Sequence, residues 1–168
     1  MTAQPPSKRG RPPGATDASL EALPAILRVL LATDGTVTET LEAWFGEPVG
    51  VTNVRMAEAD GHTRREVVLA GTRSGRRFAH AESTIALGSL PPRLETYRRG
   101  IGQALRDLRL STYREIEDSW SEISEPHALA LNLAASDRLI GRRYGIWVDG
   151  RRAIEIVERF PLGLYRTS

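Results

Sequence analysis

Apolar residues near the start of the chain recur at intervals of three and four, which is the spacing of an amphipathic helix. The first such run covers residues 20–31. A second helix is predicted to begin at Thr36, where Thr36 and Glu39 have the spacing of a capping box, and to end before Gly46. These segments predict that the chain opens with a pair of helices.

From residue 49 onward the apolar period changes to two, which is the spacing of a half-buried strand. Asp149-Gly150 is a favoured two-residue turn for joining two such strands into a hairpin. Strands are predicted over 49–54, 65–69, 77–87, 110–123, 138–148 and 152–160, and helices over 93–108 and 126–135. This order predicts an α+β fold, with a single antiparallel sheet of about five or six strands and helices packed on it.

The start of the chain is rich in proline, glycine and basic side chains, and it offers little to bury. We therefore expect residues 1–18 to form a disordered basic tail and residues 19–168 to form one domain. The chain has a net charge of +2 and a pI of about 9.4, and the tail supplies the positive excess. The stretch Lys8–Pro12 is similar to the core of an AT-hook, but we favour a solubilising tail over a nucleic-acid-binding arm.

Several classes of protein are excluded by composition. The chain contains no cysteine, which rules out a disulfide scaffold and a cysteine nucleophile. Its three histidines, His62, His80 and His127, lack the spacing of metal ligands, so we expect no metal and no cofactor. No apolar run approaches the ~18 residues of a membrane span, and the N-terminus lacks the apolar core of a secretory signal. We therefore expect a cytoplasmic protein.

Two charged residues stand at apolar positions of predicted strands. Arg65 shares a strand face with Val67 and Leu69, and Glu158 shares one with large apolar residues such as Ile156. Burying an isolated charge is costly unless the charge is paired or hydrogen-bonded. Either the two residues form a structural ion pair, or they line a pocket for a polar, anionic ligand. The pattern alone favours the structural pair.

Four groups of residues, standing in order over residues 20–165, show a resemblance to a known family. They are residues 30–38 with 41–49, residues 65–69 with 81–92, residues 101–115, and residues 141–144 with 149–165. Together they resemble the chorismate pyruvate-lyase family, and the Ala81-Glu82-Ser83 stretch is similar to that of its shorter bacterial members. The resemblance implies an antiparallel sheet and a ligand buried under helical flaps. It also implies conversion of chorismate into 4-hydroxybenzoate and pyruvate without a cofactor, so we expect chorismate and 4-hydroxybenzoate as small-molecule partners, and the oligomeric state stays open.

The resemblance also implies roles for individual residues. Arg65 would bind the ring carboxylate, and Glu158 would contact the 4-hydroxyl, with orientation favoured over a role as base. A backbone amide near Ile101 would hold the carboxylate, and Val37 would close over the ring. From strand parity alone we add Arg142 as a second cation, for the enolpyruvyl carboxylate.

Three alternatives remain open. The same fold occurs in the effector-binding domain of a family of bacterial regulators, which binds small ligands without turnover. Against this reading, only about 18 residues precede the first predicted helix, which leaves no room for a DNA-binding domain. The second alternative is a lyase-like enzyme that acts on another shikimate-derived acid. The third is a catalytically inactive scaffold or partner protein.

Overall fold

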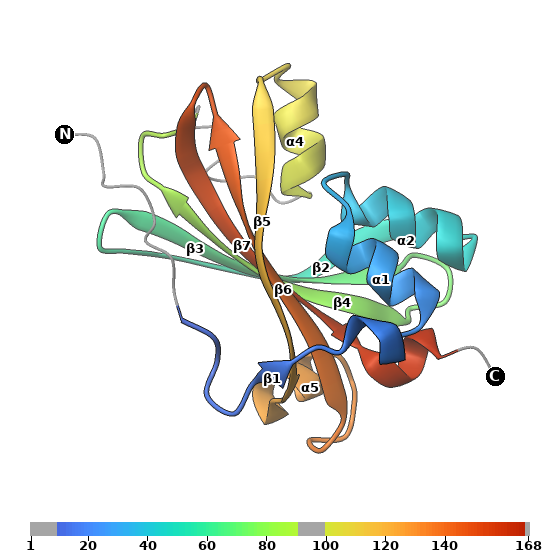
Figure 1. Cartoon of the computed structure of the whole chain (residues 1–168). Helices are drawn as coiled ribbons and strands as arrows, with labels where there is room; N and C mark the ends of the chain where they lie inside the picture. Colours follow the sequence, from blue (N-terminus) through green and yellow to red (C-terminus); the bar gives the residue numbers. More distant parts are fainter. Residues whose placement is uncertain (1–9, 91–99, 167–168) are drawn as a thin grey trace.

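The computed structural model describes residues 10–90 and 100–166. The helices are α1 (Ala25–Ala32), α2 (Val37–Phe45), α4 (Ile101–Asp107) and α5 (Glu125–Ala130), with the short 3-10 helices η1 (Leu20–Ala22) and η2 (Leu162–Tyr165). The strands are β1 (Thr16–Asp17), β2 (Val49–Ala59), β3 (His62–Gly71), β4 (Arg77–Ala86), β5 (Thr112–Ile123), β6 (Arg138–Val148) and β7 (Arg151–Pro161). These strands form one antiparallel sheet in the order β1-β5-β6-β7-β4-β3-β2 (Figure 1).

The prediction of an α+β fold with one antiparallel sheet is confirmed, but the strand number is wrong. The described residues form seven strands rather than five or six. The additional strand is β1, in which Thr16 and Asp17 pair with Ser121 and Trp120 of β5. Two residues are too short to show an alternating pattern, so the sequence carried no signal for this strand.

Part of the expected tail lies in the described region. Arg11 donates from its Nε to Asp118 Oδ2 at 2.7 Å, and Arg143 donates to the carbonyl oxygen of Gly10 at 2.9 Å. Together with β1, these contacts attach residues 10–17 to the edge of the sheet. Residues 1–9, which hold most of the basic stretch, lie outside the described residues.

The first predicted helix is interrupted. Residues 20–22 form η1, and α1 begins only after Pro24, whose ring nitrogen has no hydrogen to donate within a helix. The second helix is confirmed, and Gly46 ends it in the left-handed conformation that glycine favours. The predicted capping box is not formed, because the Thr36 side chain makes no capping bond and Glu39 pairs with Arg106 at 2.6 Å.

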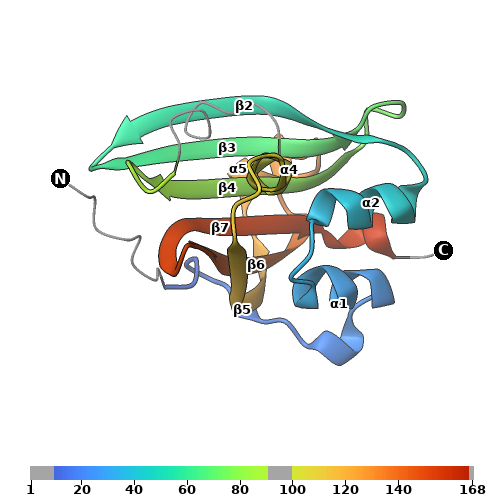
Figure 2. The ribbon, with the colours of Figure 1, turned by 90° about the horizontal axis from the view of Figure 1, so that it is seen from above.

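One face of the sheet is covered by α1, α2 and α4 (Figure 1). Figure 2 shows the sheet bent, with β2, β3 and β4 in one wall and β5, β6 and β7 in the other. The core under α1 and α2 includes Leu27, Leu30 and Leu41, which are fully buried against Phe78 and Phe160. Full burial of one such side chain contributes about 1.5–3 kcal/mol. This core fixes the N-terminal end of α2 over the sheet.

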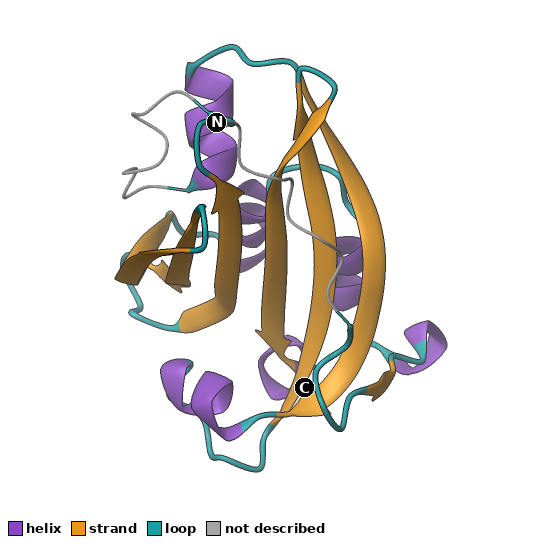
Figure 3. Cartoon of the chain, turned by 90° about the vertical axis from the view of Figure 1, so that its left-hand side faces the viewer, coloured by secondary structure: helices purple, strands orange, loops and turns teal. Residues whose placement is uncertain are grey.

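The opposite face is covered in part by α5, so helices lie on both sides of the curved sheet (Figure 3). Val68 and Leu139 contact Leu131 there. The indole of Trp120 lies over Gly141 on the neighbouring strand.

A search of the described helices finds none with both the length and the apolar character needed to cross a lipid bilayer.

Candidate active site

A cavity of about 60 Å³ lies on the face of the sheet that α2 and α4 cover. Its floor is formed by β3, β4, β6 and β7, and its roof is formed by the first turns of α2 and α4. Four of the five residues proposed from the sequence line it, namely Val37, Arg65, Ile101 and Glu158. These residues are up to 121 positions apart in the chain, and the fold brings them to one cavity.

Arg65 is held in the centre of β3, opposite Met56 of β2 and Ser83 of β4. It is only 5% exposed, and burial lowers the pKa of its guanidinium to about 10. The group therefore remains charged at neutral pH. A buried cation facing a cavity is stabilised by an anion there, because the interaction is weakly screened by solvent.

Glu158 forms its ion pair with Arg142, which lies directly opposite it on β6. Arg142 Nε donates to Glu158 Oε2 at 2.7 Å, and the Tyr144 hydroxyl donates to Oε1 at 3.0 Å. Burial, together with the nearby carboxylate, raises the pKa of the Tyr144 phenol far above its usual value, so Tyr144 remains a neutral donor. Both carboxylate oxygens of Glu158 are therefore held in position by donors.

Arg142 lies behind the carboxylate and is not among the residues that line the cavity in the described part of the chain. Its side chain is fully buried, and Nη1 donates to the carbonyl oxygen of Thr33 at 2.8 Å. Its guanidinium carbon lies 4.7 Å from the centre of the Tyr144 ring, within the range of a cation–π contact. Although burial opposes the charge, the Glu158 carboxylate raises the pKa of Arg142. Arg142 thus positions Glu158 and the loop before α2.

Arg114 of β5 is a cavity residue that the sequence analysis missed. Its Nη1 donates to the carbonyl oxygen of Asp34 at 2.7 Å, which ties β5 to the loop before α2. The surrounding sequence, from Tyr113 to Asp118, is almost entirely polar or charged. Arg114 therefore does not share a strand face with a run of apolar residues, so the alternation pattern did not mark it as a charge at an apolar position.

The roof of the cavity depends on one glycine. A side chain at Gly102 would approach an Arg114 Nη atom at 3.1 Å and Thr36 at 3.4 Å, so its absence lets α4 lie close to α2. Val37 and Ile101 are 5% and 7% exposed and close the cavity from above. The first turns of α2 and α4 therefore cover the cavity at the place where the resemblance implies helical flaps.

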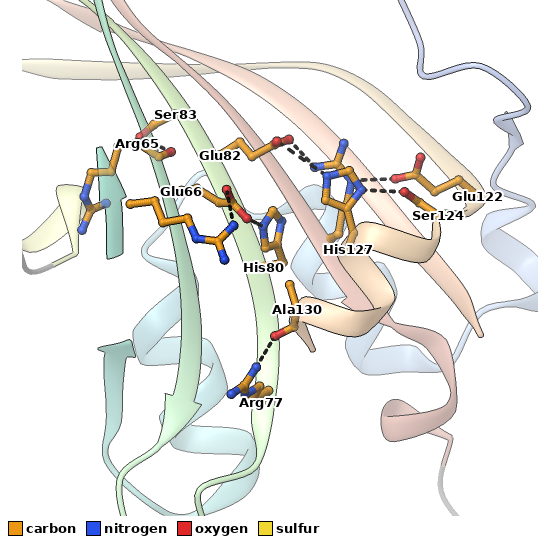
Figure 4. Close-up of polar contacts among 12 residues, drawn as sticks. Arg65, Glu66, Arg77, His80, Glu82, Ser83, Glu122, Ser124, His127 and Ala130 are labelled. Carbon is orange, nitrogen blue, oxygen red and sulfur yellow. Dashed lines mark hydrogen bonds and ion pairs between the residues drawn. The ribbon is translucent and has the colours of Figure 1, made fainter. Parts of the chain in front are cut away.

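A second hollow, of about 280 Å³, opens where β2, β3, β4 and β7 present their other face. It is bordered by charged residues of both signs, among them the exposed Arg64, the half-buried Glu66 and the buried Glu155, and Arg65 borders this hollow as well as the cavity. Figure 4 shows Glu66 and Glu82 on this side of the sheet. The cavity under α2 and α4 is the better candidate for an anionic ring, because Arg65, Arg114 and Glu158 line it together with apolar residues such as Val67 and Ile156.

Comparison with known proteins agrees with this arrangement. A family model described as chorismate pyruvate-lyase, Rv2949c-like, matches residues 31–168. The chain belongs to this family. The matched segment contains every residue that lines the cavity.

Named relatives support the assignment to the Rv2949c-like chorismate pyruvate-lyase family. The chorismate pyruvate-lyase of Mycobacterium leprae is 29% identical, over 84% of this chain and 77% of that protein. The chorismate pyruvate-lyase of Mycobacterium tuberculosis is 25% identical, over 91% of this chain and 88% of that protein.

Solved structures with a similar fold include proteins with a different name from the lyases above. PhnF from Mycobacterium smegmatis aligns with a TM-score of 0.60 and 17% identity, over 81% of this chain and 67% of that one. The effector domain of PhnF aligns with a TM-score of 0.58 and 18% identity, over 79% of this chain and 91% of that one. At this level of identity, the family member shares a fold with these structures and nothing more is implied.

Proposed function

We propose that the chain eliminates pyruvate from chorismate to give 4-hydroxybenzoate. The observation that supports this most strongly is that Arg65 and Glu158 line one cavity, in a chain of the chorismate pyruvate-lyase family. In this reaction the enolpyruvyl ether bond at C3 breaks and the hydrogen at C4 leaves as a proton. The ring becomes aromatic, and the departing enolpyruvate takes up a proton at its methylene carbon to become pyruvate, which balances the proton lost from C4. Aromatisation supplies the driving force, so the protein mainly has to bind, orient and exclude water.

Arg65 binds the ring carboxylate in this proposal. A guanidinium presents two parallel donors to a carboxylate, which fixes the plane of the carboxylate as well as its position. The carboxylate is retained in the product, so this contact holds substrate and product alike. It would also return to Arg65 part of the charge stabilisation that burial removes.

Glu158 orients the 4-hydroxyl rather than acting as the base. Its oxygens already accept hydrogen bonds from Arg142 and Tyr144, so the carboxylate is held in one orientation by its donors. The remaining lone pairs can accept a hydrogen bond from the hydroxyl of the substrate. That bond would hold the ring in one rotational setting above Ile156, which shares the cavity floor.

Arg114 receives the second carboxylate, on the enolpyruvyl group. Chorismate carries two negative charges, and Arg65 and Arg114 are the two arginines among the cavity residues of the described chain. They reach the cavity from opposite walls, β3 and β5. Two cations at separate points bind an extended dianion in one direction only, which fits a reaction that distinguishes the two ends of its substrate.

The small size of the cavity requires the roof to open for binding. A volume of about 60 Å³ admits only a few water molecules, which each need at least about 10–15 Å³ on the same measure. The contacts across the roof include polar ones, such as the bond from Arg114 to the carbonyl oxygen of Asp34. Displacement of the first turns of α2 and α4 would admit the ring, and their return would exclude water from it.

The direct test is to incubate the purified chain with chorismate. 4-Hydroxybenzoate is followed by chromatography, and pyruvate is followed by its enzymatic reduction. We expect both products in equal amounts, and no product above the spontaneous rate would overturn the proposal. Arg65→Ala should lower kcat/KM by about a hundredfold or more, because it removes a charged pair in a buried site. Arg64→Ala, next in the chain but exposed, is the matched control and should retain activity.

A second candidate is a ligand-sensing domain that binds without turnover. The observation that favours it is the shared fold with the effector domain of PhnF. Calorimetric titration with 4-hydroxybenzoate and with chorismate separates the two. Tight binding of an aromatic acid by a chain that leaves chorismate unchanged would favour sensing, and turnover of a different shikimate-derived acid would instead place the chain beside the lyases.

A further inference from the structure

Three side chains with metal-binding groups meet on the face of the sheet opposite the cavity. They are His80 and Glu82, which stand two positions apart on β4, and His127 of α5. One ligand atom from each lies within 4.8 Å of the other two. Figure 4 shows the three side chains near one another, between the sheet and α5. No residue of this group lines the cavity described above.

Each histidine has one ring nitrogen held by a partner. His80 Nε2 lies 2.9 Å from Glu66 Oε1, and His127 Nδ1 lies 2.7 Å from the Ser124 hydroxyl (Figure 4). In a metal site the ligating histidine commonly donates its other N–H to such an acceptor, which sets the tautomer and orients the ring. Both histidines therefore already possess the outer contacts of metal ligands.

The remaining ring nitrogens are the ones expected to bind. His80 is fully buried, and its Nδ1 has no hydrogen-bond partner within the described part of the chain. His127 Nε2 lies 3.6 Å from Glu82 Oε1. Ligands of a tetrahedral zinc ion, bound at about 2.0–2.1 Å, lie about 3.3 Å apart. Small side-chain movements would bring this group to that spacing, and Glu82 retains the freedom for them because its side chain is 43% exposed.

The local charge favours a cation. Glu82 shares its other oxygen with Arg159, and Arg159 also bonds Glu122 at 2.7 Å. Three carboxylates, those of Glu66, Glu82 and Glu122, therefore lie around the three side chains. The cations near them are the buried guanidinium of Arg159 and the exposed guanidinium of Arg55, which lies 3.9 Å from Glu66.

We propose that His80, Glu82 and His127 bind one divalent cation of the zinc class. Two imidazoles and one carboxylate are a donor set that suits zinc, and copper or nickel bind similar sets. Glu82 also borders the hollow of about 280 Å³, which would give the ion a route from solvent. The ion would join α5 to the centre of the sheet, a link that β4 and α5 otherwise make through side chains such as Arg77, whose Nη1 bonds the carbonyl oxygen of Ala130 at 2.5 Å.

The experiment is a titration of the full, untagged chain with zinc chloride after treatment with a chelator. Calorimetry should show one equivalent bound, and the melting temperature should rise with zinc, because an ion that binds only the folded state stabilises it. Cobalt chloride should give the visible absorption bands of a four-coordinate site. His127→Ala removes one ligand on a surface helix and should weaken binding by about tenfold or more.

His62→Ala is the matched control, because His62 bonds the carbonyl oxygen of Asp60 in the β2–β3 turn and lies outside the group. It should bind zinc as the wild type does. Glu82→Gln provides a second ligand variant should His127→Ala fold poorly. Absence of stoichiometric binding would overturn the proposal, and so would equal affinity in wild type, His127→Ala and Glu82→Gln, or an equal loss in His62→Ala.

Discussion

The guanidinium of Arg142 and the carboxylate of Glu158 lie directly opposite each other on β6 and β7, with Nε 2.7 Å from Oε2. The side chain of Arg142 is fully buried and that of Glu158 is 6% exposed. The pair thus gives Glu158 two roles at once. It is one half of a buried ion pair in the sheet, and it is the carboxylate that faces the cavity.

These two roles can be separated by mutation. Glu158→Gln should lower the free energy of unfolding by about 3–5 kcal/mol, because it leaves the Arg142 charge buried without its partner. A double variant, Arg142→Met with Glu158→Leu, should recover much of that stability, since apolar residues often replace a buried pair without loss. Chemical denaturation measures the stability, and the chorismate assay measures activity. Activity should stay low in both variants, and recovered turnover in the double variant would contradict a role for Glu158 in orienting substrate.

Arg114 tests the site that the sequence did not reveal. Arg114→Gln should lower kcat/KM for chorismate by roughly ten- to a hundredfold, since a hydrogen bond to a charged group contributes about 1.5–3 kcal/mol. We expect the binding of 4-hydroxybenzoate to change much less, because this product lacks the enolpyruvyl carboxylate. Arg151→Gln, at an exposed position, serves as the control. Equal losses for substrate and product would show that Arg114 acts through the fold rather than on the second carboxylate.

Gly141 should tolerate no side chain. A Cβ at this position would overlap the Trp120 ring, which is fully buried and has no space to retreat into. Gly141→Ala should therefore lower the free energy of unfolding by about 1–3 kcal/mol, the usual range for overpacking. Thermal or chemical unfolding measures this change. Gly163→Ala is the control, because a Cβ there meets nothing within 4 Å, and a similar loss in both variants would rule out the steric explanation.

His80 should make the metal-free protein less stable in mild acid. Burial lowers the pKa of His80 below its unfolded value of about 6.5. His127 and Arg159 lower this pKa further, whereas Glu66 and Glu82 act to raise it. As the pH falls below about 6.5 the unfolded chain takes up a proton that folded His80 resists, so the free energy of unfolding falls. Denaturation between pH 7 and pH 5, in the presence of a chelator, measures the slope.

The variant His80→Asn should show a smaller slope over this range than the wild type, because the residue that resists protonation is gone. His62→Asn should keep the wild-type slope, since His62 lies in the β2–β3 turn outside this group. A His80→Asn slope identical to that of the wild type would assign the acid sensitivity to other groups.

Local sequence determined much of the architecture. The change of apolar period near residue 49 predicted the six longer strands, because each side chain of a strand points to a face set by its own position. The same alternation identified Arg65 and Glu158 as charges on apolar faces, and both line the cavity. The resemblance carried by scattered motifs then predicted the family that the comparison of residues 31–168 shows.

The tertiary structure decided what those charges meet. Strand register, which depends on the whole sheet, places Glu158 opposite Arg142. The bend of the sheet brings Arg114 to the side of the cavity that faces Arg65. Long-range packing also attaches β1 to the edge and places His127 against His80, 47 positions earlier in the chain. Alternation along a strand reports which face a residue occupies, whereas its neighbours on that face are set by the pairing and curvature of distant segments, for which a single sequence carries no local signal.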